Sequence, residues 1–251
     1  MNRIWFILVA SLLLLSCNKQ TPEKEVLPRT QKERVRWFEE ARLGIMIHWS
    51  LCTPAAGRFY GEKVRNSEYA EWIRCHNKVQ KADWDKMAKR MPISEKEIED
   101  WVIATKEGGF KYLTFVTKHH DGVAFWNSKV SDYTYGNLSG THFDVLKCLK
   151  EKCEKHGIVL CAYYSQWLDW GDMNGRNNDW DYADEQKTHF DRIAAGRGEI
   201  DAPYRQLPTE EAYDKYWREK AMPQVAELIK EYGVKLFWFD CWRADPVAEG
   251  Q

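Results

Sequence analysis

Four apolar segments separated by helical patterns constrain the fold of this chain more than any other feature. They are residues 43–49, 110–117, 158–165 and 234–240. Strands that are apolar on both faces and connected through helices are typical of a parallel α/β sheet. The expected order is therefore β-α-β-α-β-α-β, in a chain of 251 residues that suits one domain or a full eight-stranded barrel.

Long connections follow the first and third expected strands, at residues 50–82 and 166–207. Loops of this length in a compact domain are usually functional. They leave the carboxyl ends of the strands, which is where (β/α)₈ barrels place their active sites. No glycine-rich nucleotide loop follows the first strand. The pattern favours a (β/α)₈ TIM-like barrel, truncated after about four βα units, over a doubly wound sheet.

Local signals also mark the helices between these strands. Ser94 and Glu97 form a capping box that predicts a helix running to about residue 106, ended by glycines at 108 and 109. A second helix is expected from residue 140 or 141 to about 156, ended by Gly157. A third is expected from Thr209, broken or restarted near Pro223.

Residues 1–17 have the pattern of an export signal. Arg3 gives the positive start, residues 4–15 form an apolar run too short for a spanning helix, and Leu-Leu-Ser-Cys17 resembles a bacterial lipobox. An ordinary secretory signal is the alternative. Residues 18–33 are polar and indicate a tether, followed by the catalytic domain at 34–251. We expect an exported lipoprotein, held at the periplasmic side or outer membrane through lipidated Cys17.

The amino-acid composition excludes few classes of function. The net charge of −1 gives no reason to expect a nucleic-acid partner. Thirteen Trp, twelve Tyr and ten Phe suit sugar-ring contacts and cores equally well. Six cysteines remain after Cys17, without a CxxC pair, which favours buried free thiols over a zinc site or a disulfide framework.

Polar residues stand where three of the expected strands end. His48 ends the first, His119-His120 follows the second, and Asp240 ends the fourth. Because side chains alternate along a strand, Trp238 and Asp240 should share one face. Asp240 is a nucleophile candidate, with a loop-capping Asp as the alternative. His48 is either a ligand or a satisfied polar strand end.

A metal interpretation of the His pair is the next alternative. Adjacent strand residues point to opposite faces, so His119 and His120 are not expected to bind one ion, and no further ligands stand out. We therefore expect no metal and no cofactor, and we prefer hydrogen bonding to substrate. A His-rich metal hydrolase is kept as an alternative function.

A series of motifs occurs in a fixed order from about residue 36 to 243. They are Trp37-Phe38, Leu43–Trp49, Tyr69-Ala70-Glu71-Trp72, Thr117–Gly122, Trp126, Ser128–Tyr133, Gly157 with Ala162–Ser165, Asp169-Trp170 and Leu236–Asp240. Together they resemble the catalytic barrel of glycoside hydrolase family 29, the α-L-fucosidases. The His-His-Asp-Gly block is the most specific of these motifs.

The resemblance implies a retaining hydrolase that releases α-L-fucose from fucosylated glycans or glycosides, with Asp240 as nucleophile. The implied substrate-binding residues are His48, Glu71, Trp72, His119, His120, Tyr163 and Trp238. The histidines would hydrogen-bond sugar hydroxyls, and the two tryptophans would pack on the apolar faces of the ring and its methyl group. Asp121 is expected to support the His pair. The substrate partner is a fucosylated oligosaccharide or glycoconjugate.

The sequence also departs from the family pattern. Phe143 stands where the family usually has Arg before Asp144, Val123 where Phe is common, and the stretch from Tyr164 to Asp240 is longer than expected. Retention requires two carboxyls roughly 5–5.5 Å apart, and the family's acid/base lies in later strands. We therefore expect the chain alone to be inactive and poorly stable, because half a barrel has two open edges. A truncated fragment with at most residual sugar binding is the alternative function.

Overall fold

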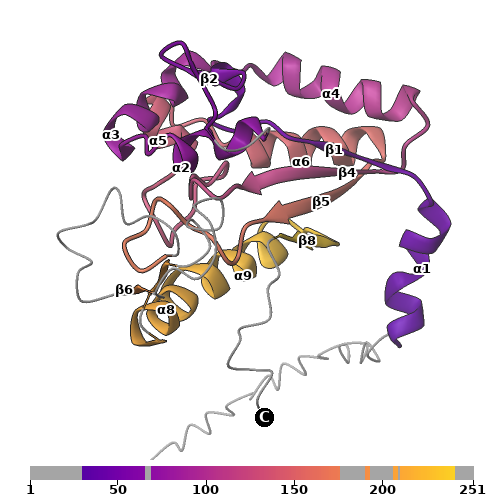
Figure 1. Ribbon diagram of the computed structural model, residues 1–251. Helices are drawn as coiled ribbons and strands as arrows, with labels where there is room; N and C mark the ends of the chain where they lie inside the picture. The colour runs from indigo at the N-terminus through magenta and orange to yellow at the C-terminus, as the bar shows by residue number, and fades with distance from the viewer. Residues whose placement is uncertain (1–29, 66–68, 176–189, 193–205, 209, 241–251) are drawn as a thin grey trace, which may run out of the picture. The chain divides into compact units, whose positions relative to one another are not determined.

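The computed structural model describes residues 30–65, 69–175, 190–192, 206–208 and 210–240 (Figure 1). The expected export signal with Cys17, most of the expected tether and Cys241 lie outside these residues. Contacts group the chain into residues 1–40 and residues 41–251. Helix α1 (Gln31–Ala41) starts beside Thr30, whose N–H donates to Glu33 Oε2 at 2.7 Å. Among the described helices, none has the length and apolar character needed to cross a membrane.

A four-stranded parallel sheet forms the centre of residues 41–251. Its order is β1-β4-β5-β8, with the bounds β1 (Gly44–Ile47), β4 (Tyr112–Lys118), β5 (Val159–Tyr164) and β8 (Phe237–Phe239). Each strand pairs in parallel with the next one along the sheet. This confirms the predicted parallel α/β sheet, with the four expected segments supplying its strands.

The two outer strands are shorter than predicted. Strands β1 and β8 each have one described neighbour, so pairing fixes them from one side only. Pairing continues before β8 without a regular ladder, since the Lys235 N–H donates to the Leu160 carbonyl at 3.3 Å. The Ala162 N–H likewise donates to the Leu236 carbonyl, at 2.9 Å. The sequence predicted the position of the apolar segment, but hydrogen bonding to the neighbouring strand determines how many of its residues are in a strand.

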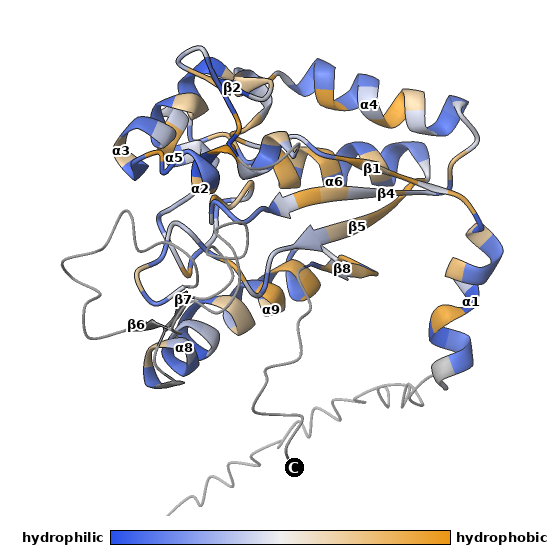
Figure 2. Cartoon of the chain, in the orientation of Figure 1, coloured by the Kyte–Doolittle hydropathy of each residue, from blue (hydrophilic) through white to orange (hydrophobic). Residues whose placement is uncertain are grey.

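Helices cover one face of the sheet. Helices α4 (Glu95–Glu107) and α6 (Val145–His156) pack on each other and on β4 and β5, and α9 (Met222–Lys230) lies by β5 and β8 (Figure 1). Residues of these helices and strands form one core cluster. Figure 2 shows hydrophobic residues, in orange, along the same helices and strands. Alternation then directs Tyr164 to the helices, where its O–H bonds Gln224, and Tyr163 to the opposite face. That opposite face bears the candidate site.

The helix boundaries test the local signals. Ser94 and Glu97 form both bonds of the predicted capping box. The second helix starts later than predicted, because Gly140 ends a separate short helix, α5 (Tyr135–Ser139), and Asp144 caps α6. The third helix is interrupted before Pro223, as predicted: α8 (Glu210–Tyr216) passes through a π-helical turn (Trp217–Ala221) into α9.

The two long connections contain short elements of their own. The first holds the hairpin β2 (Arg58–Phe59) and β3 (Glu62–Lys63), then α2 (Ile73–His76) and α3 (Lys81–Trp84). The described part of the second contains an antiparallel pair, β6 (Phe190–Arg192) and β7 (Gln206–Pro208). The described cysteines 52, 75, 148, 153 and 161 are free thiols, and all but Cys52 are buried, as predicted.

Candidate functional site

The two adjacent histidines lie side by side at the end of β4. Their ring centroids are 4.1 Å apart, and the His119 ring also lies 4.8 Å from His48 and stacks on Tyr163 at 5.6 Å. The expectation that the pair would point to opposite faces is therefore wrong. Both residues follow the last residue of β4, beyond a register shift between Val116 and Lys118, so strand alternation no longer applies to them.

A carboxylate faces this group from the end of β8. Tyr163 donates its O–H to Asp240 Oδ2 at 2.6 Å, and His120 Nε2 lies 3.6 Å from the same oxygen. Trp238 lies two residues earlier on β8, opposite Tyr163 in the register, and is exposed. The structure thus brings Asp240 together with His120 and Tyr163, while the Trp238 side chain remains open to solvent.

The first long connection adds two of the other predicted residues. A 3₁₀ turn, η2 (Ala70–Trp72), buries the Trp72 ring with its centroid 5.0 Å from that of His120 and 5.4 Å from that of Trp170. Burial lowers the pKa of His48, and the carboxylates of Glu71 and Asp240 oppose that shift. Negative charge from both carboxylates therefore acts on His48, and Glu71 lies in the same 3₁₀ turn as Trp72.

Burial sets the protonation of the His pair. It lowers the pKa of His119 well below its ordinary value, and the neighbouring His120 and His48 act in the same direction. Burial lowers the pKa of His120 to about 3, against the opposing charge of Asp240. Both imidazoles are therefore neutral near pH 7, and each offers one donor and one acceptor, as hydroxyl recognition requires. In the part of the chain that the structure describes, no group of three His, Cys, Asp or Glu side chains is arranged to hold a metal ion.

Asp121 does not have the role expected for it. Its carboxylate accepts from Trp84 Nε1 at 3.1 Å and from the Val123 N–H at 3.2 Å, rather than from either histidine. Its carbonyl oxygen accepts from Arg74 at 3.1 Å, and a second Arg74 nitrogen donates to the Trp170 carbonyl at 3.0 Å. Because α3 brings the Trp84 indole to this carboxylate, Asp121 fixes the loop after β4 instead of supporting the His pair.

A buried charge cluster behind the site was not predicted. Lys118 Nζ and Lys220 Nζ lie 2.8 and 3.0 Å from Asp169 Oδ2, and Lys118 also donates to the Tyr216 hydroxyl at 2.9 Å. A Cβ atom at Gly122 would collide with the Asp169 carboxylate, so glycine is required there. A lysine at the end of an apolar strand was the available signal, because buried lysines need a partner. Nothing in the sequence pattern pointed to Asp169 as that partner.

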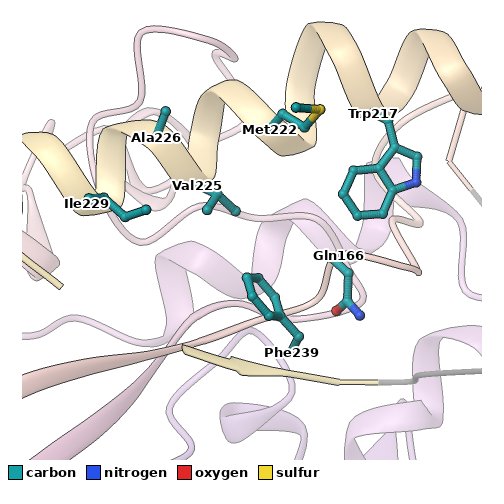
Figure 3. A pocket seen from close by; sticks show the side chains of 7 residues that line it. All are labelled: Gln166, Trp217, Met222, Val225, Ala226, Ile229 and Phe239. Carbon is teal, nitrogen blue, oxygen red and sulfur yellow. The ribbon is translucent and has the colours of Figure 1, made fainter. Parts of the chain in front are cut away.

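An apolar cavity of about 480 Å³ lies apart from these residues, between α9 and β8 (Figure 3). It is lined by Gln166, Trp217, Met222, Val225, Ala226, Ile229 and Phe239. Phe239 stacks on Phe237 at 5.2 Å, as two residues sharing one strand face should. The cavity is therefore on the helix side of β8, opposite the face expected for Trp238 and Asp240.

The site combines a carboxylate, neutral histidines and tryptophans near the strand ends of a parallel α/β sheet. Together these groups define a candidate carbohydrate-active site. The alpha-L-fucosidase family model matches residues 12–250, and the chain belongs to this family.

Solved fucosidase structures resemble the chain in both sequence and fold. AlfC from Lactobacillus casei, in complex with its α-L-fucose product, is 30% identical with a TM-score of 0.67, over 86% of this chain and 64% of AlfC. A Bacteroides thetaiotaomicron GH29 fucosidase, a trapped covalent intermediate with 2-fluoro-fucosyl fluoride, is 28% identical with a TM-score of 0.63, over 84% and 42%.

Curated relatives are more distant in sequence. Human plasma alpha-L-fucosidase is 22% identical over 209 residues, which is 81% of this chain and 38% of that protein. Bovine tissue alpha-L-fucosidase is 24% identical over 213 residues, with the same two shares. The chain thus spans about two fifths of the length of these relatives.

Proposed function

We propose that this chain forms the fucose-binding and nucleophile-bearing part of a retaining α-L-fucosidase. The observation that supports this most is the Asp240 carboxylate, which accepts from the Tyr163 hydroxyl at 2.6 Å, lies 3.6 Å from His120 Nε2 and is partly open to solvent. A strand-end Asp that only capped a loop would not need this donor. The trapped covalent intermediate of the Bacteroides relative and the fucose complex of AlfC support the same assignment.

The proposed reaction follows from the carboxylate. An Asp240 oxygen attacks the anomeric carbon, the glycosidic C–O bond breaks, and an acid protonates the departing oxygen. Water then cleaves the glycosyl ester from the same face as the departed group, and retains the configuration. Neutral His48, His119 and His120 would bind hydroxyls, and Trp72 would pack on the apolar part of the ring.

The acid/base carboxyl is not assigned to a described residue. Asp121 is engaged by Trp84 and Val123, on the loop after β4. Glu71 acts on His48 as Asp240 does, and the family resemblance gives it a binding role. We propose that the acid/base group belongs to a part of the barrel outside the described residues.

We also propose that the sheet is part of a (β/α)₈ barrel. Strands β1 and β8 each have one described neighbour, and Trp238 and Phe239 on β8 are exposed. The apolar cavity between α9 and β8 has the place and character to receive the next βα unit (Figure 3). A further parallel strand beside β8 would cover both the open strand edge and this cavity.

Replacing the nucleophile tests the proposed function. Asp240→Gly, in the active polypeptide that contains this chain, should lower turnover of an aryl α-L-fucoside by roughly 10⁴-fold or more. Azide should restore part of the rate by attacking from the vacated side, and the product should be the inverted glycosyl azide. Asp132→Gly, at an exposed loop position, is the matched control and should keep full activity. Undiminished turnover in Asp240→Gly would remove Asp240 from this role.

For localisation, we propose that Cys17 is lipidated and anchors the protein to a membrane. The support is the apolar run ending in Leu-Leu-Ser-Cys. Expressed in a bacterium, the precursor should incorporate labelled fatty acid and partition with membranes, and Cys17→Ala should do neither. Equal labelling of the two forms would contradict the anchor.

A further inference from the structure

A buried serine connects His120 to the loop after β5. Ser165 is fully buried, and its Oγ lies 2.8 Å from His120 Nδ1 and 2.8 Å from the Leu168 carbonyl oxygen. A hydroxyl carries one proton, and a carbonyl oxygen can only accept. The Ser165 proton is therefore directed to Leu168, and the bond to His120 requires a proton on Nδ1.

This arrangement determines the other nitrogen of the ring. Burial lowers the pKa of His120, and Lys118 and His48 act in the same direction. The carboxylates of Asp240 and Asp169 oppose this shift but do not overcome it. The imidazole is therefore neutral and has a single N–H. With that proton on Nδ1, Nε2 has a lone pair. Nε2 lies 3.6 Å from Asp240 Oδ2, and two acceptors cannot bond each other. A hydroxyl that donates to Nε2 would lie next to the carbon that Asp240 attacks.

We infer that Ser165 is a positioning residue that holds His120 in the Nδ1–H tautomer, so that Nε2 accepts a hydrogen bond from a sugar hydroxyl near the anomeric carbon. The sugar part of this inference rests on the proposed function, whereas the tautomer does not. Ser165 acts only through His120 and does not itself touch the substrate.

The surrounding contacts prevent Ser165 and Leu168 from rearranging. The Ser165 N–H donates to the Lys118 carbonyl at 2.9 Å, and the Lys118 ammonium holds Asp169, the residue after Leu168. The Trp170 N–H donates to the His120 carbonyl at 2.7 Å. The short loop after β5 thus fixes His120 through its backbone. The same loop orients the Ser165 proton through the Leu168 carbonyl, which the buried charge cluster keeps in place.

Nitrogen NMR measures directly which ring nitrogen of His120 carries the proton. In the complete chain labelled with ¹⁵N-histidine, two-bond ¹H–¹⁵N correlations distinguish Nδ1–H from Nε2–H, and the signals that disappear in His120→Gln identify His120. We expect Nδ1–H for His120 at pH 7 in the wild type. We expect that signature to be lost in Ser165→Ala, and kept in Ser128→Ala, whose hydroxyl donates to Glu227 at 2.7 Å instead.

The outcomes separate this inference from the proposed function. An Nε2–H signal in the wild type would overturn the inference, as would an unchanged Nδ1–H signal in Ser165→Ala. The wild-type spectrum decides the first point even if the variant fails to fold. Titration with fucose gives a second readout, and Ser165→Ala should weaken binding about tenfold relative to Ser128→Ala. A wild-type Nδ1–H signal in a protein that does not bind fucose would contradict only the proposed function.

Discussion

The two sides of the candidate site are built in different ways. One side, here called the His wall, consists of His119, His120 and Ser165 at the ends of β4 and β5. His120 is 1% exposed and Ser165 is 0% exposed. The other side, the β8 edge, consists of Trp238 and Asp240, with 56% of Trp238 and 38% of the Asp240 side chain exposed. The His wall stands on strands paired on both sides, whereas β8 has one described neighbour.

Under the proposed function, the His wall would bind the sugar hydroxyls and the β8 edge would carry the reaction. The His wall is held by buried ion pairs and loop contacts of its own, so its geometry needs nothing from the substrate. Asp240 accepts a short bond from Tyr163, and its strand β8 has one described neighbour. Under the proposed function, the side that binds sugar hydroxyls is therefore held more firmly than the side that bears the nucleophile.

Removing the charge behind the His wall should have the largest effect on stability. Asp169→Asn leaves two buried ammonium groups, Lys118 and Lys220, without this carboxylate, and should lower the free energy of unfolding by about 3–5 kcal/mol. Asp214→Asn, which breaks an exposed pair with Arg218, should cost under about 1 kcal/mol. Urea unfolding measures both variants. Equal effects would mean that the buried cluster does not hold the His wall.

The same carboxyl gives the stability a dependence on pH. Burial alone would raise the pKa of Asp169, but Lys118 and Lys220 outweigh burial and lower it to about 2. A lowered pKa means that the contribution is present above the ordinary Asp value near 4 and is lost as the pH falls from about 4 to about 2. Stability of Asp169→Asn should fall less steeply across this interval. Parallel curves for the two proteins would contradict the assignment.

Replacing Trp72, which packs on His120, and Trp238, on the β8 edge, compares the contributions of the two sides to stability directly. Trp72 is buried against His120 and Trp170, so Trp72→Ala should lower the free energy of unfolding by about 3 kcal/mol. Trp238 is exposed, and Trp238→Ala should change it by no more than about 0.5 kcal/mol. Both variants should weaken fucose binding in calorimetric titrations. A large loss of stability in Trp238→Ala would show that the β8 edge is covered in the protein.

A smaller effect is expected where the two sides meet. Tyr163→Phe removes the donor to Asp240 but keeps the ring that stacks on His119. Bonds to charged groups contribute about 1.5–3 kcal/mol, so kcat/KM should fall roughly 10- to 100-fold. Tyr60→Phe, at an exposed position, is the control. If kcat/KM in Tyr163→Phe stayed at the control value, this hydroxyl would have no part in holding the nucleophile.

The sequence predicted the parallel sheet because apolar runs and helix caps are local signals, as in the Ser94–Glu97 capping box. It predicted less well where tertiary pairing decides, as in the length of β8 and the later start of α6. The motifs named residues that the structure brings together around His120. The supporting groups escaped prediction, since Ser165 and Asp169 gain their roles only when the loop after β5 folds against β4.

Covalent labelling tests the central claim most directly, namely that Asp240 attacks the sugar held by the His wall. A 2-fluoro-fucosyl fluoride, the compound type trapped in the Bacteroides relative, should leave a fluorofucosyl ester on the active polypeptide that contains this chain. Digestion and mass spectrometry locate the modified residue. The account predicts the added mass on Asp240. The ester on Glu71 or Asp121, or turnover without any ester on Asp240, would contradict it.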